Sequence, residues 1–296
     1  MPNTIALAQA FLPLLDEVYK VASCTSVLDA MQKRLRFINA NTVQVFETSM
    51  SGLADYDRNN GFVDGEVTGE WKPYVLEQDR GRSFMVDEMD DEETLRMAFG
   101  TLVSEFMRRH VVPEIDAYTF AKIAGTEGIK SVSADVTADT NIAKAIDEAD
   151  AQLNDAEVPQ EGRLLFISEP SYTAFVGNTN RTILNGEGAL NNAITSYNGK
   201  RIIRVPQNRF NTAITMATNG EGGYTPTAGG FKINFMLMHP SAVSKIVKHA
   251  KPRIFAPDTN QKADAWKFDY RIYHDTFVMN NKKSGIYVHH AAAANA

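Results

Sequence analysis

Two kinds of hydrophobic periodicity alternate along this 296-residue chain. Near the N-terminus, apolar residues recur at helical spacing over residues 11–18 and again over residues 27–35. Residues 42–46 (TVQVF) then alternate polar and apolar side chains and include β-branched residues, which predicts a strand. We therefore expect a helical or extended arm over residues 1–41, followed by β-structure.

A long amphipathic helix is predicted in the first half of the chain. Its apolar residues step by four, three and four positions and share one face: Leu95, Phe99, Leu102 and Phe106. The acidic residues 90–93 provide an N-cap candidate and charges that favour the helix dipole. Pro113 should kink or restart the helix, and Gly125 should end it. A helix over residues 92–124 would be about 50 Å long, which exceeds what one compact domain normally accommodates.

The second half of the chain alternates helices and strands. The apolar spacing predicts a helix over residues 142–153 and strands over 163–168 and 201–205. A pattern of strand, proline, serine and helix occurs twice, in residues 163–176 (RLLFISEPSYTAFV) and 231–250 (FKINFMLMHPSAVSKIVKHA). The pattern predicts two related units in one sheet, each with its own helix.

The C-terminal part of the chain has a different pattern. Residues 265–289 alternate as strands do, and residues 280–285 are typical of a hairpin turn between two of these strands. The last residues, 291–296, are alanine-rich, and we assign them no role.

Residues 47–93 differ from the rest of the chain in charge. They include 14 acidic and 4 basic residues, a net charge of −10, whereas the remainder carries +4. Asn59, Asn60 and Gly61 form a turn signal, and residues 82–87 are typical of a returning strand. Ordering about 40 residues costs ~40–80 kcal/mol of backbone entropy, which the few apolar residues here do not offset. We predict a long polar hairpin that is either mobile or held by another surface.

The overall composition limits the possible functions. Hydrophobic residues make up 44% of the chain and charged residues 22%, so it can bury a sizeable core. The net charge of −6 argues against nucleic-acid binding through a large basic face. Cys24 is the single cysteine, which excludes an internal disulfide and a multi-cysteine metal site. The sequence shows no secretion signal and no apolar run of about 18 residues, so we expect a soluble protein without a membrane partner.

A search for catalytic motifs gives no candidate. None of the six histidines has metal-ligand spacing, and the glycine pattern fits neither a nucleotide-binding loop nor a nucleophile elbow. We therefore expect no catalytic residue, no cofactor and no metal. His239 is expected to cap or pack, and Cys24 to be a buried small residue. Arg108 and Arg109 leave two interpretations open: an exposed helix face with salt bridges, or pairing with the acidic hairpin of a neighbouring subunit.

The most specific resemblance lies in residues 80–125 (RGRSFMVDEMDDEETLRMAFGTLVSEFMRRHVVPEIDAYTFAKIAG). This stretch is similar to the exit of the extended loop and the spine helix in major capsid proteins of tailed double-stranded DNA bacteriophages, which have the Hong Kong 97-type fold. Residues 163–176 and 233–251 resemble strand–helix units of the axial domain, and residues 265–289 resemble closing strands of the peripheral domain. The resemblance extends in order over residues 42–289.

The resemblance implies an α+β fold with several parts. These are an N-terminal arm (1–41), a peripheral domain (42–46, 88–135 and 251–296) with the spine helix 92–124, an extended loop (47–87) and an axial domain (136–250). It also implies intersubunit contacts through the extended loop and the spine helix, and the candidates are Trp71, Lys72, Tyr74, Arg80, Arg82, Arg108 and Arg109.

The function that the resemblance implies is structural and not enzymatic. Identical subunits would form pentamers and hexamers of an icosahedral phage head, which touches packaged double-stranded DNA by non-specific contact. A portal and a separate scaffolding protein would be partners, and assembly would take place in the host cytoplasm before the subunit resides in the virion. Some family members form Lys–Asn crosslinks, but Lys72 is the only lysine in the extended loop and we carry over no catalytic residue.

Two alternatives remain. An encapsulin-type nanocompartment shell protein would share the fold and enclose an enzyme cargo, and neighbouring genes would discriminate between the two. An α/β enzyme with an unrecognised site would have a deep pocket with paired titratable groups near the strand–Pro–Ser–helix units.

Overall fold

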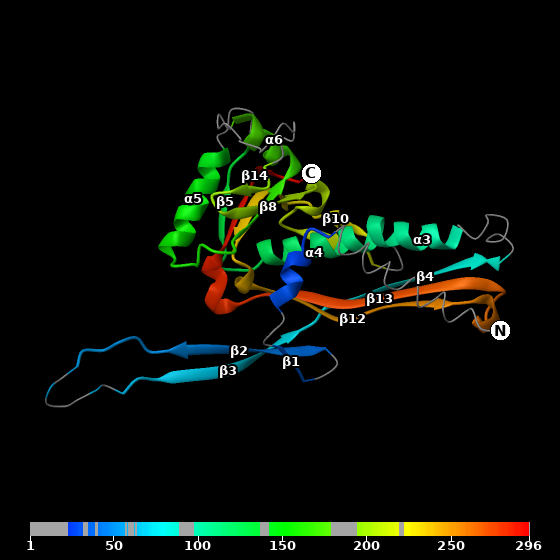
Figure 1. Ribbon diagram of the computed structural model, residues 1–296, viewed down its shortest axis with the longest axis horizontal. Coiled ribbons are helices and arrows are strands. Elements are labelled where there is room, and N and C mark those ends of the chain that lie inside the picture. The colour runs from blue at the N-terminus through cyan, green and yellow to red at the C-terminus, as the bar shows by residue number, and fades with distance from the viewer. Residues whose placement is uncertain are drawn as a thin grey trace, which may run out of the picture.

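The computed structural model describes residues 23–31, 35–38, 41–56, 58, 62, 64–88, 98–136, 142–178, 194–218 and 222–295. Three regions are visible in Figure 1: a long helix lying along a three-stranded sheet, a mixed sheet with helices against it, and a two-stranded hairpin that projects away from both. The protein has an α+β fold, as the sequence predicts.

The projecting hairpin is formed near the N-terminus. After a short 3₁₀ helix, Ser26–Met31, come β1 (Leu35–Phe37), β2 (Thr42–Met50) and β3 (Val67–Val75). They form an antiparallel sheet in the order β1-β2-β3, in which all nine residues of β2 pair with β3. The strand predicted over residues 42–46 is confirmed within β2. The predicted turn at residues 59–61 lies outside the described residues.

The next strand belongs to another sheet. β4 (Gln78–Asp87) pairs with β13 (Ala265–Val278), which pairs with β12 (Val243–Phe255), and all neighbours are antiparallel. We call this three-stranded sheet the spine sheet. A strand at residues 82–87 is therefore confirmed, but its predicted role as the returning strand of the hairpin is wrong. The hairpin returns through β3, because Phe84 and Val86 of β4 pack instead into a core that the hairpin does not possess.

The long helix is continuous across its proline. It comprises α3 (Ala98–Phe106), a π-helical turn (Met107–Val111) and α4 (Val112–Ala124), and we call residues 98–124 the spine helix. Pro113 has no N–H to donate and its ring crowds the preceding turn, which the wider π turn accommodates. The predicted end at Gly125 is confirmed. Residues 90–97, with the predicted N-cap, lie outside the described residues.

A six-stranded mixed sheet makes up the other end of the molecule. Its strand order is β5-β14-β11-β6-β8-β7. The strands are β5 (Lys130–Ser133), β6 (Leu164–Ser168), β7 (Ser196–Tyr197), β8 (Lys200–Val205), β11 (Phe231–Met238) and β14 (Ile286–Ala294). Helices α5 (Ile142–Asp155) and α6 (Glu169–Asn178) pack on one face, and the pair β9 (Ile214–Met216) and β10 (Tyr224–Pro226) lies beside the sheet near α4.

Side chains along the central strands alternate between the two faces of this sheet, so each face packs against its own hydrophobic core. Leu164 and Phe166 face a cluster that includes Phe120 of α4, whereas Leu165 and Ile167 face a cluster that includes Ile146 of α5. All five residues of β6 are buried, as expected for a strand covered on both faces.

The helix predicted to follow the second strand–Pro–Ser unit is wrong. The structure has only a 3₁₀ turn (Pro240–Ala242) followed by strand β12. Val243, Ile246 and Val247 are β-branched, and β12 pairs with β13 along its length, so sheet pairing outweighs the helical spacing. The two units do lie in one sheet, because β6 and β11 are antiparallel neighbours, but only the first is followed by a helix.

Two features of the C-terminal part also differ from expectation. Residues 280–285 form a 3₁₀ segment, and it joins strands of different sheets, so it is not a hairpin turn. The predicted domain limit at residue 250 falls inside β12, and the predicted peripheral segment 251–296 contains β14, which pairs in the six-stranded sheet. Elsewhere the predicted division into domains stays a prediction.

Candidate interaction surface

Apolar side chains on the hairpin of residues 42–75 are not covered by the part of the chain that the structure describes. All the exposed large hydrophobic residues among the described residues lie between Phe37 and Met85. On the hairpin and its tip they are Phe46, Met50, Leu53, Tyr56, Phe62, Val67, Trp71 and Val75. Phe62 is 88% exposed and Met50 70%. A concentration of apolar surface on one projecting element is typical of an interaction site.

Aromatic pairs give this surface a defined shape. Phe46 and Trp71 are directly opposite on β2 and β3, with ring centroids 5.1 Å apart. The Phe46 ring also lies over Gly69, where a Cβ atom would come within 2.8 Å of the ring. Near the tip, the rings of Tyr56 and Phe62 are 4.9 Å apart. Each pair contributes about 0.5–1.5 kcal/mol beyond area burial, so the rings hold one another in place while remaining accessible.

The base of the hairpin is anchored to the body by a buried carboxylate. Asp275 of β13 accepts hydrogen bonds from the Glu77 backbone N–H (2.9 Å) and from the Tyr118 hydroxyl (2.8 Å). Burial raises the pKa of Asp275 and also that of Tyr118. The Tyr273 hydroxyl donates to the Leu76 carbonyl (2.9 Å), so the exit of the hairpin is fixed to both α4 and β13.

A second buried carboxylate anchors the N-terminal segment. Asp116 of α4 is fully buried and accepts hydrogen bonds from the hydroxyls of Ser23 (2.8 Å) and Thr25 (2.6 Å) and from the Cys24 backbone N–H (2.9 Å). The Thr25 backbone N–H also donates to it (3.3 Å), and the Arg209 guanidinium lies 3.3 Å away. The segment that leads into the hairpin is therefore fixed to the middle of the spine helix.

Cys24 is only partly buried, where the sequence predicted a buried small residue. Burial, and then the nearby Asp116 carboxylate, raise the pKa of its thiol to about 11. The thiol is protonated at neutral pH and packs as a small apolar group.

The predicted contact residues of the hairpin lie in different environments. Trp71 is exposed, and its ring lies tilted against that of Phe46. Lys72 is on the same strand, and Tyr74 is partly buried, with its ring 4.9 Å from that of Phe277. Trp71 is thus on the accessible part of the hairpin and Tyr74 at its base, and contacts of all three with a neighbour stay predictions.

The predicted contact arginines of β4 and the spine helix also lie in different environments. Arg80 is engaged within its own chain, because its guanidinium binds Glu114 (2.7 Å) and the Ala217 carbonyl (2.7 Å). Arg82, Arg108 and Arg109 are exposed, and Arg109 lies 3.4 Å from Glu105 on the same helix.

The contact of Arg109 with Glu105 matches the salt-bridge interpretation of this helix face. Contacts of Arg80, Arg82, Arg108 and Arg109 with a neighbouring subunit stay predictions, as they do for the hairpin residues.

A groove of 540 Å³ lies between β4, the π-helical turn and the loop that joins β9 to β10. Its lining includes the Arg80–Glu114 pair, Phe106, His110 and His274. Burial, and then the positive charges of Lys245 and Arg80, lower the pKa of His274 to about 4, so the imidazole is neutral at pH 7. The groove lies beside the spine helix and not near the strand–Pro–Ser–helix units, where the enzyme alternative places its pocket.

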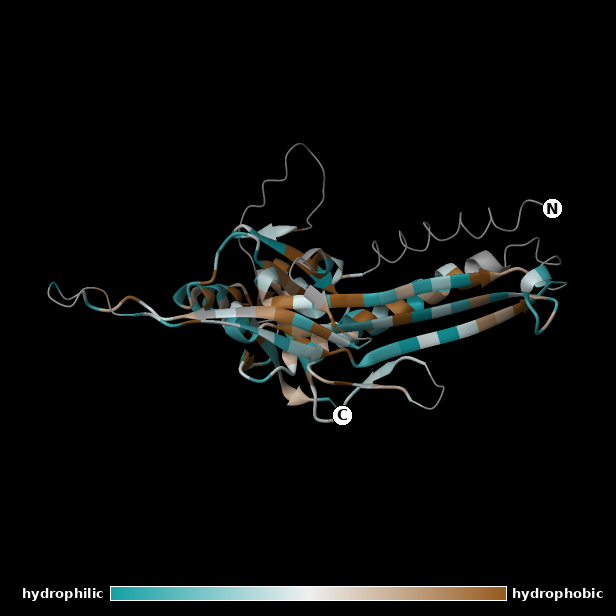
Figure 2. Cartoon of the chain, turned by 90° about the horizontal axis from the view of Figure 1, so that it is seen from below, coloured by the Kyte–Doolittle hydropathy of each residue, from teal (hydrophilic) through white to brown (hydrophobic). Residues whose placement is uncertain are grey.

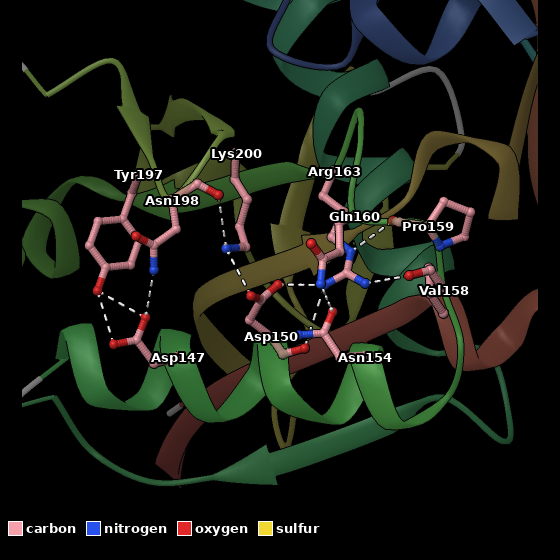
Figure 3. Close-up of polar contacts among 10 residues, drawn as sticks. All are labelled: Asp147, Asp150, Asn154, Val158, Pro159, Gln160, Arg163, Tyr197, Asn198 and Lys200. Carbon is pink, nitrogen blue, oxygen red and sulfur yellow. Dashed lines mark hydrogen bonds and ion pairs between the residues drawn. The ribbon is translucent and has the colours of Figure 1, made fainter.

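A cluster of charged groups does lie near the first of these units, and Figure 3 shows it. The buried guanidinium of Arg163 binds Asp150 of α5 (2.5 Å) and the carbonyl of Pro159 (2.9 Å). Lys200 lies 3.0 Å from the same carboxylate, and the Tyr197 hydroxyl donates to Asp147 (2.9 Å). These contacts join α5 to the sheet. We therefore interpret the cluster as structural.

Other sequence candidates have local roles. His239 caps the 3₁₀ turn, because its side chain accepts a hydrogen bond from the Ser241 backbone N–H (3.3 Å), as predicted. The described residues contain no group of three or more His, Cys, Asp or Glu placed to hold a metal ion. No helix in the described ranges is long and apolar enough to cross a bilayer.

Comparison with known proteins identifies the architecture. No protein-family model and no characterised protein matches the sequence. The mature capsid of bacteriophage PhiM1 matches with a TM-score of 0.60 at 10% identity, over 85% of this chain and 82% of that one. A chain of Gordonia phage Cozz matches at 0.59 and 14% identity, over 90% and 87%. A virus-like particle from Pyrococcus furiosus matches at 0.54 and 11% identity, over 95% and 98%. The chain therefore has the Hong Kong 97-type fold of tailed-phage capsid proteins.

Proposed function

We propose that this protein is the structural subunit of an icosahedral phage head. The observation that carries the proposal is the β2–β3 hairpin, which exposes aromatic and aliphatic side chains that the other described residues do not cover. A subunit whose hairpin lies on a neighbouring copy removes this apolar surface from water. The shared fold supports the same conclusion, since capsids are among the structures that this chain resembles.

Closed symmetry explains how such contacts build a shell. Every copy presents the same hairpin and the same receiving surface, so one contact repeated around a ring closes into a pentamer or a hexamer. Individual contacts need only moderate area, because each subunit makes several of them. The anchored base supports this arrangement, since it holds the hairpin away from its own body (Figure 1).

The finer parts of the proposal follow from the same role. The shell would enclose double-stranded DNA by non-specific contact, include a portal and use a separate scaffolding protein during assembly in the host cytoplasm. Trp71, Lys72, Tyr74, Arg80, Arg82, Arg108 and Arg109 would lie at contacts between subunits. The role is structural and not enzymatic, and an encapsulin-type shell with enzyme cargo is not better supported.

The proposal is tested by expressing the full chain alone and observing its assembly. Sedimentation and electron microscopy should show closed shells, or rings of five or six subunits. A single species near the subunit mass of 32.8 kDa at all concentrations would contradict the proposal. Nucleic acid recovered from nuclease-treated particles would distinguish a genome container from a shell loaded with an enzyme.

A further inference from the structure

We propose that the groove beside the spine helix is a binding site for a small aromatic anion, a flat ring that carries one phosphate or carboxylate group. The groove lies between β4, the π-helical turn and the loop that joins β9 to β10, and its volume is 540 Å³. Ligand sites in proteins typically have volumes of about 300–1,000 Å³. The inference goes beyond the proposed function, because a shell role does not require a small-molecule site.

The groove lies on the covered side of the spine sheet. Hydrophilic and hydrophobic residues alternate along the strands of this sheet in Figure 2, as expected when one face is covered. Tyr270, Ile272 and His274 are buried at alternate positions of β13, and all three line the groove. Arg82 of β4 is the Cα partner of Tyr270, so its side chain is on the same face. The sheet therefore presents both polar and apolar side chains to one space.

A buried histidine without a polar partner is the strongest indication of a ligand. His274 is 1% exposed, yet its ring atom Nδ1 has no hydrogen-bond partner among the described residues. The ring lies edge-on to that of Tyr118, with centroids 5.6 Å apart, and this contact supplies packing only. Buried polar atoms in folded proteins are normally hydrogen-bonded, and leaving one unsatisfied is costly. A polar group that enters the groove would give this imidazole the partner that it lacks.

Two arginines supply the groups that recognise an anion. Arg80 and Arg82 are two positions apart on β4, and both line the groove. Glu114 (2.7 Å) and the Ala217 carbonyl (2.7 Å) hold the Arg80 guanidinium in a fixed orientation. A guanidinium presents several N–H groups in one plane and binds phosphate or carboxylate with two parallel hydrogen bonds. The arginines therefore favour an anionic ligand over a neutral one.

Aromatic side chains form the wall against which a flat ring can pack. The ring of Phe106 lies edge-on to Phe84, with centroids 4.8 Å apart, and to Tyr270, at 6.2 Å. His110 stacks on Phe106 from the exposed side, at 5.9 Å. All four side chains line the groove. Aromatic pairs gain energy beyond that of area burial, so this wall favours an aromatic ligand over an aliphatic one.

The carboxylates of the groove limit the charge of the ligand. Asp79 and Glu114 also line it, and each is bound to an arginine, Asp79 to Arg271 (2.8 Å) and Glu114 to Arg80. These carboxylates would repel a polymer that brings many phosphates, whereas a ligand with one anionic group can place it at the arginines and its ring on the aromatic wall. The chemistry of the groove thus fits a small molecule better than a nucleic acid.

The test is isothermal titration calorimetry of the purified full-length protein with four probes. Adenosine monophosphate and indole-3-acetate join an aromatic ring to a phosphate or a carboxylate, and the two distinguish which anionic group the site takes. Adenosine and inorganic phosphate each lack one of the two parts. We expect at least one aromatic anion to bind about tenfold or more tightly than adenosine or phosphate. If neither aromatic anion does so, the inference is overturned.

Two variants locate the binding in the groove. Arg82→Ala and Phe106→Leu should each weaken binding of the aromatic anion about tenfold, because one removes an anion donor and the other an aromatic surface. The matched control is Arg253→Ala, an exposed arginine of β12 that does not line the groove, and it should bind as the wild type does. Unchanged circular dichroism shows that each variant is folded.

The outcomes separate this inference from the proposed function. If Arg82→Ala binds the probe as tightly as Arg253→Ala, the ligand lies elsewhere and the inference is overturned. A wild-type protein that assembles into shells but binds neither aromatic anion also overturns the inference and leaves the proposed function intact. A wild-type protein that binds the probe through Arg82 but never assembles supports the inference and contradicts the proposed function.

Discussion

The six-stranded sheet and the β2–β3 hairpin use their apolar residues in opposite ways. Every residue of β6 is buried, because α4 packs on one face of the sheet and α5 and α6 pack on the other. β3 exposes most of its residues, and the aromatic side chains of the hairpin cover one another only in part. The sheet is therefore covered by its own chain, whereas the described part of the chain leaves the hairpin uncovered, and in the proposed shell a neighbouring copy would cover it.

This difference shows where the free energy of the assembled state arises. Fully burying one large apolar side chain is worth about 1.5–3 kcal/mol. The six-stranded region gains that energy when the subunit folds. In the proposed shell, the hairpin would gain this energy only when a neighbour covers Phe46, Trp71 and the tip, so we expect folding and assembly to depend on different residues.

The largest effect is expected in the core of the six-stranded sheet. Phe166→Ala removes a fully buried ring that packs edge-on against Phe120, and should lower the free energy of unfolding by about 3–5 kcal/mol. Urea denaturation of the free subunit measures this loss. A change below about 1 kcal/mol would show that this core is not what holds the subunit together.

The free energy of unfolding should depend on pH through the buried histidine of the spine sheet, His274, and not through an accessible histidine. His274 has its pKa lowered to about 4 in the folded state, against 6.5 in the unfolded chain. The unfolded chain therefore takes up the proton first as pH falls, so stability is complete above pH 6.5 and decreases between pH 6.5 and 4. We expect a loss on the order of 2–3 kcal/mol over this interval.

The measurement is urea denaturation at pH 7 and pH 5 for the wild type, His274→Gln and the control His249→Gln. The control residue lies on β12 of the spine sheet and is partly exposed. His274→Gln should flatten the pH dependence and His249→Gln should leave it intact. Equal pH slopes in all three proteins would contradict the assignment.

The smallest effect on the free subunit is expected on the hairpin. Trp71→Ala should change the unfolding free energy by less than about 1.5 kcal/mol, because the ring is exposed and its main contact is Phe46. The same substitution should strongly reduce particle yield in sedimentation. A variant that loses subunit stability as Phe166→Ala does, yet still assembles, would reverse the comparison.

Local signals in the sequence predicted several of these elements. The spacing of apolar residues predicted the spine helix to Gly125 and the helix α5, and the acidic composition with few apolar residues predicted the projecting hairpin. The helix predicted at residues 242–250 was wrong because the partner strand β13, which decides the outcome, is distant in sequence.

The anchors of the hairpin and of the N-terminal segment could not be predicted. Asp275 meets Glu77 from 198 positions away, and Asp116 meets Ser23 from 93. A buried carboxylate of this kind looks like any other acidic residue in the sequence, since its role depends on which backbone N–H groups the fold brings to it.

Limited proteolysis of residues 47–66 in free subunits and in assembled particles tests the central claim most directly. The hairpin tip should be cut readily in the free subunit and resist cleavage in the particle, where a second copy covers it. Equal cleavage rates in both states would mean that the exposed apolar surface stays uncovered after assembly, which would contradict the claim that another copy completes the hairpin.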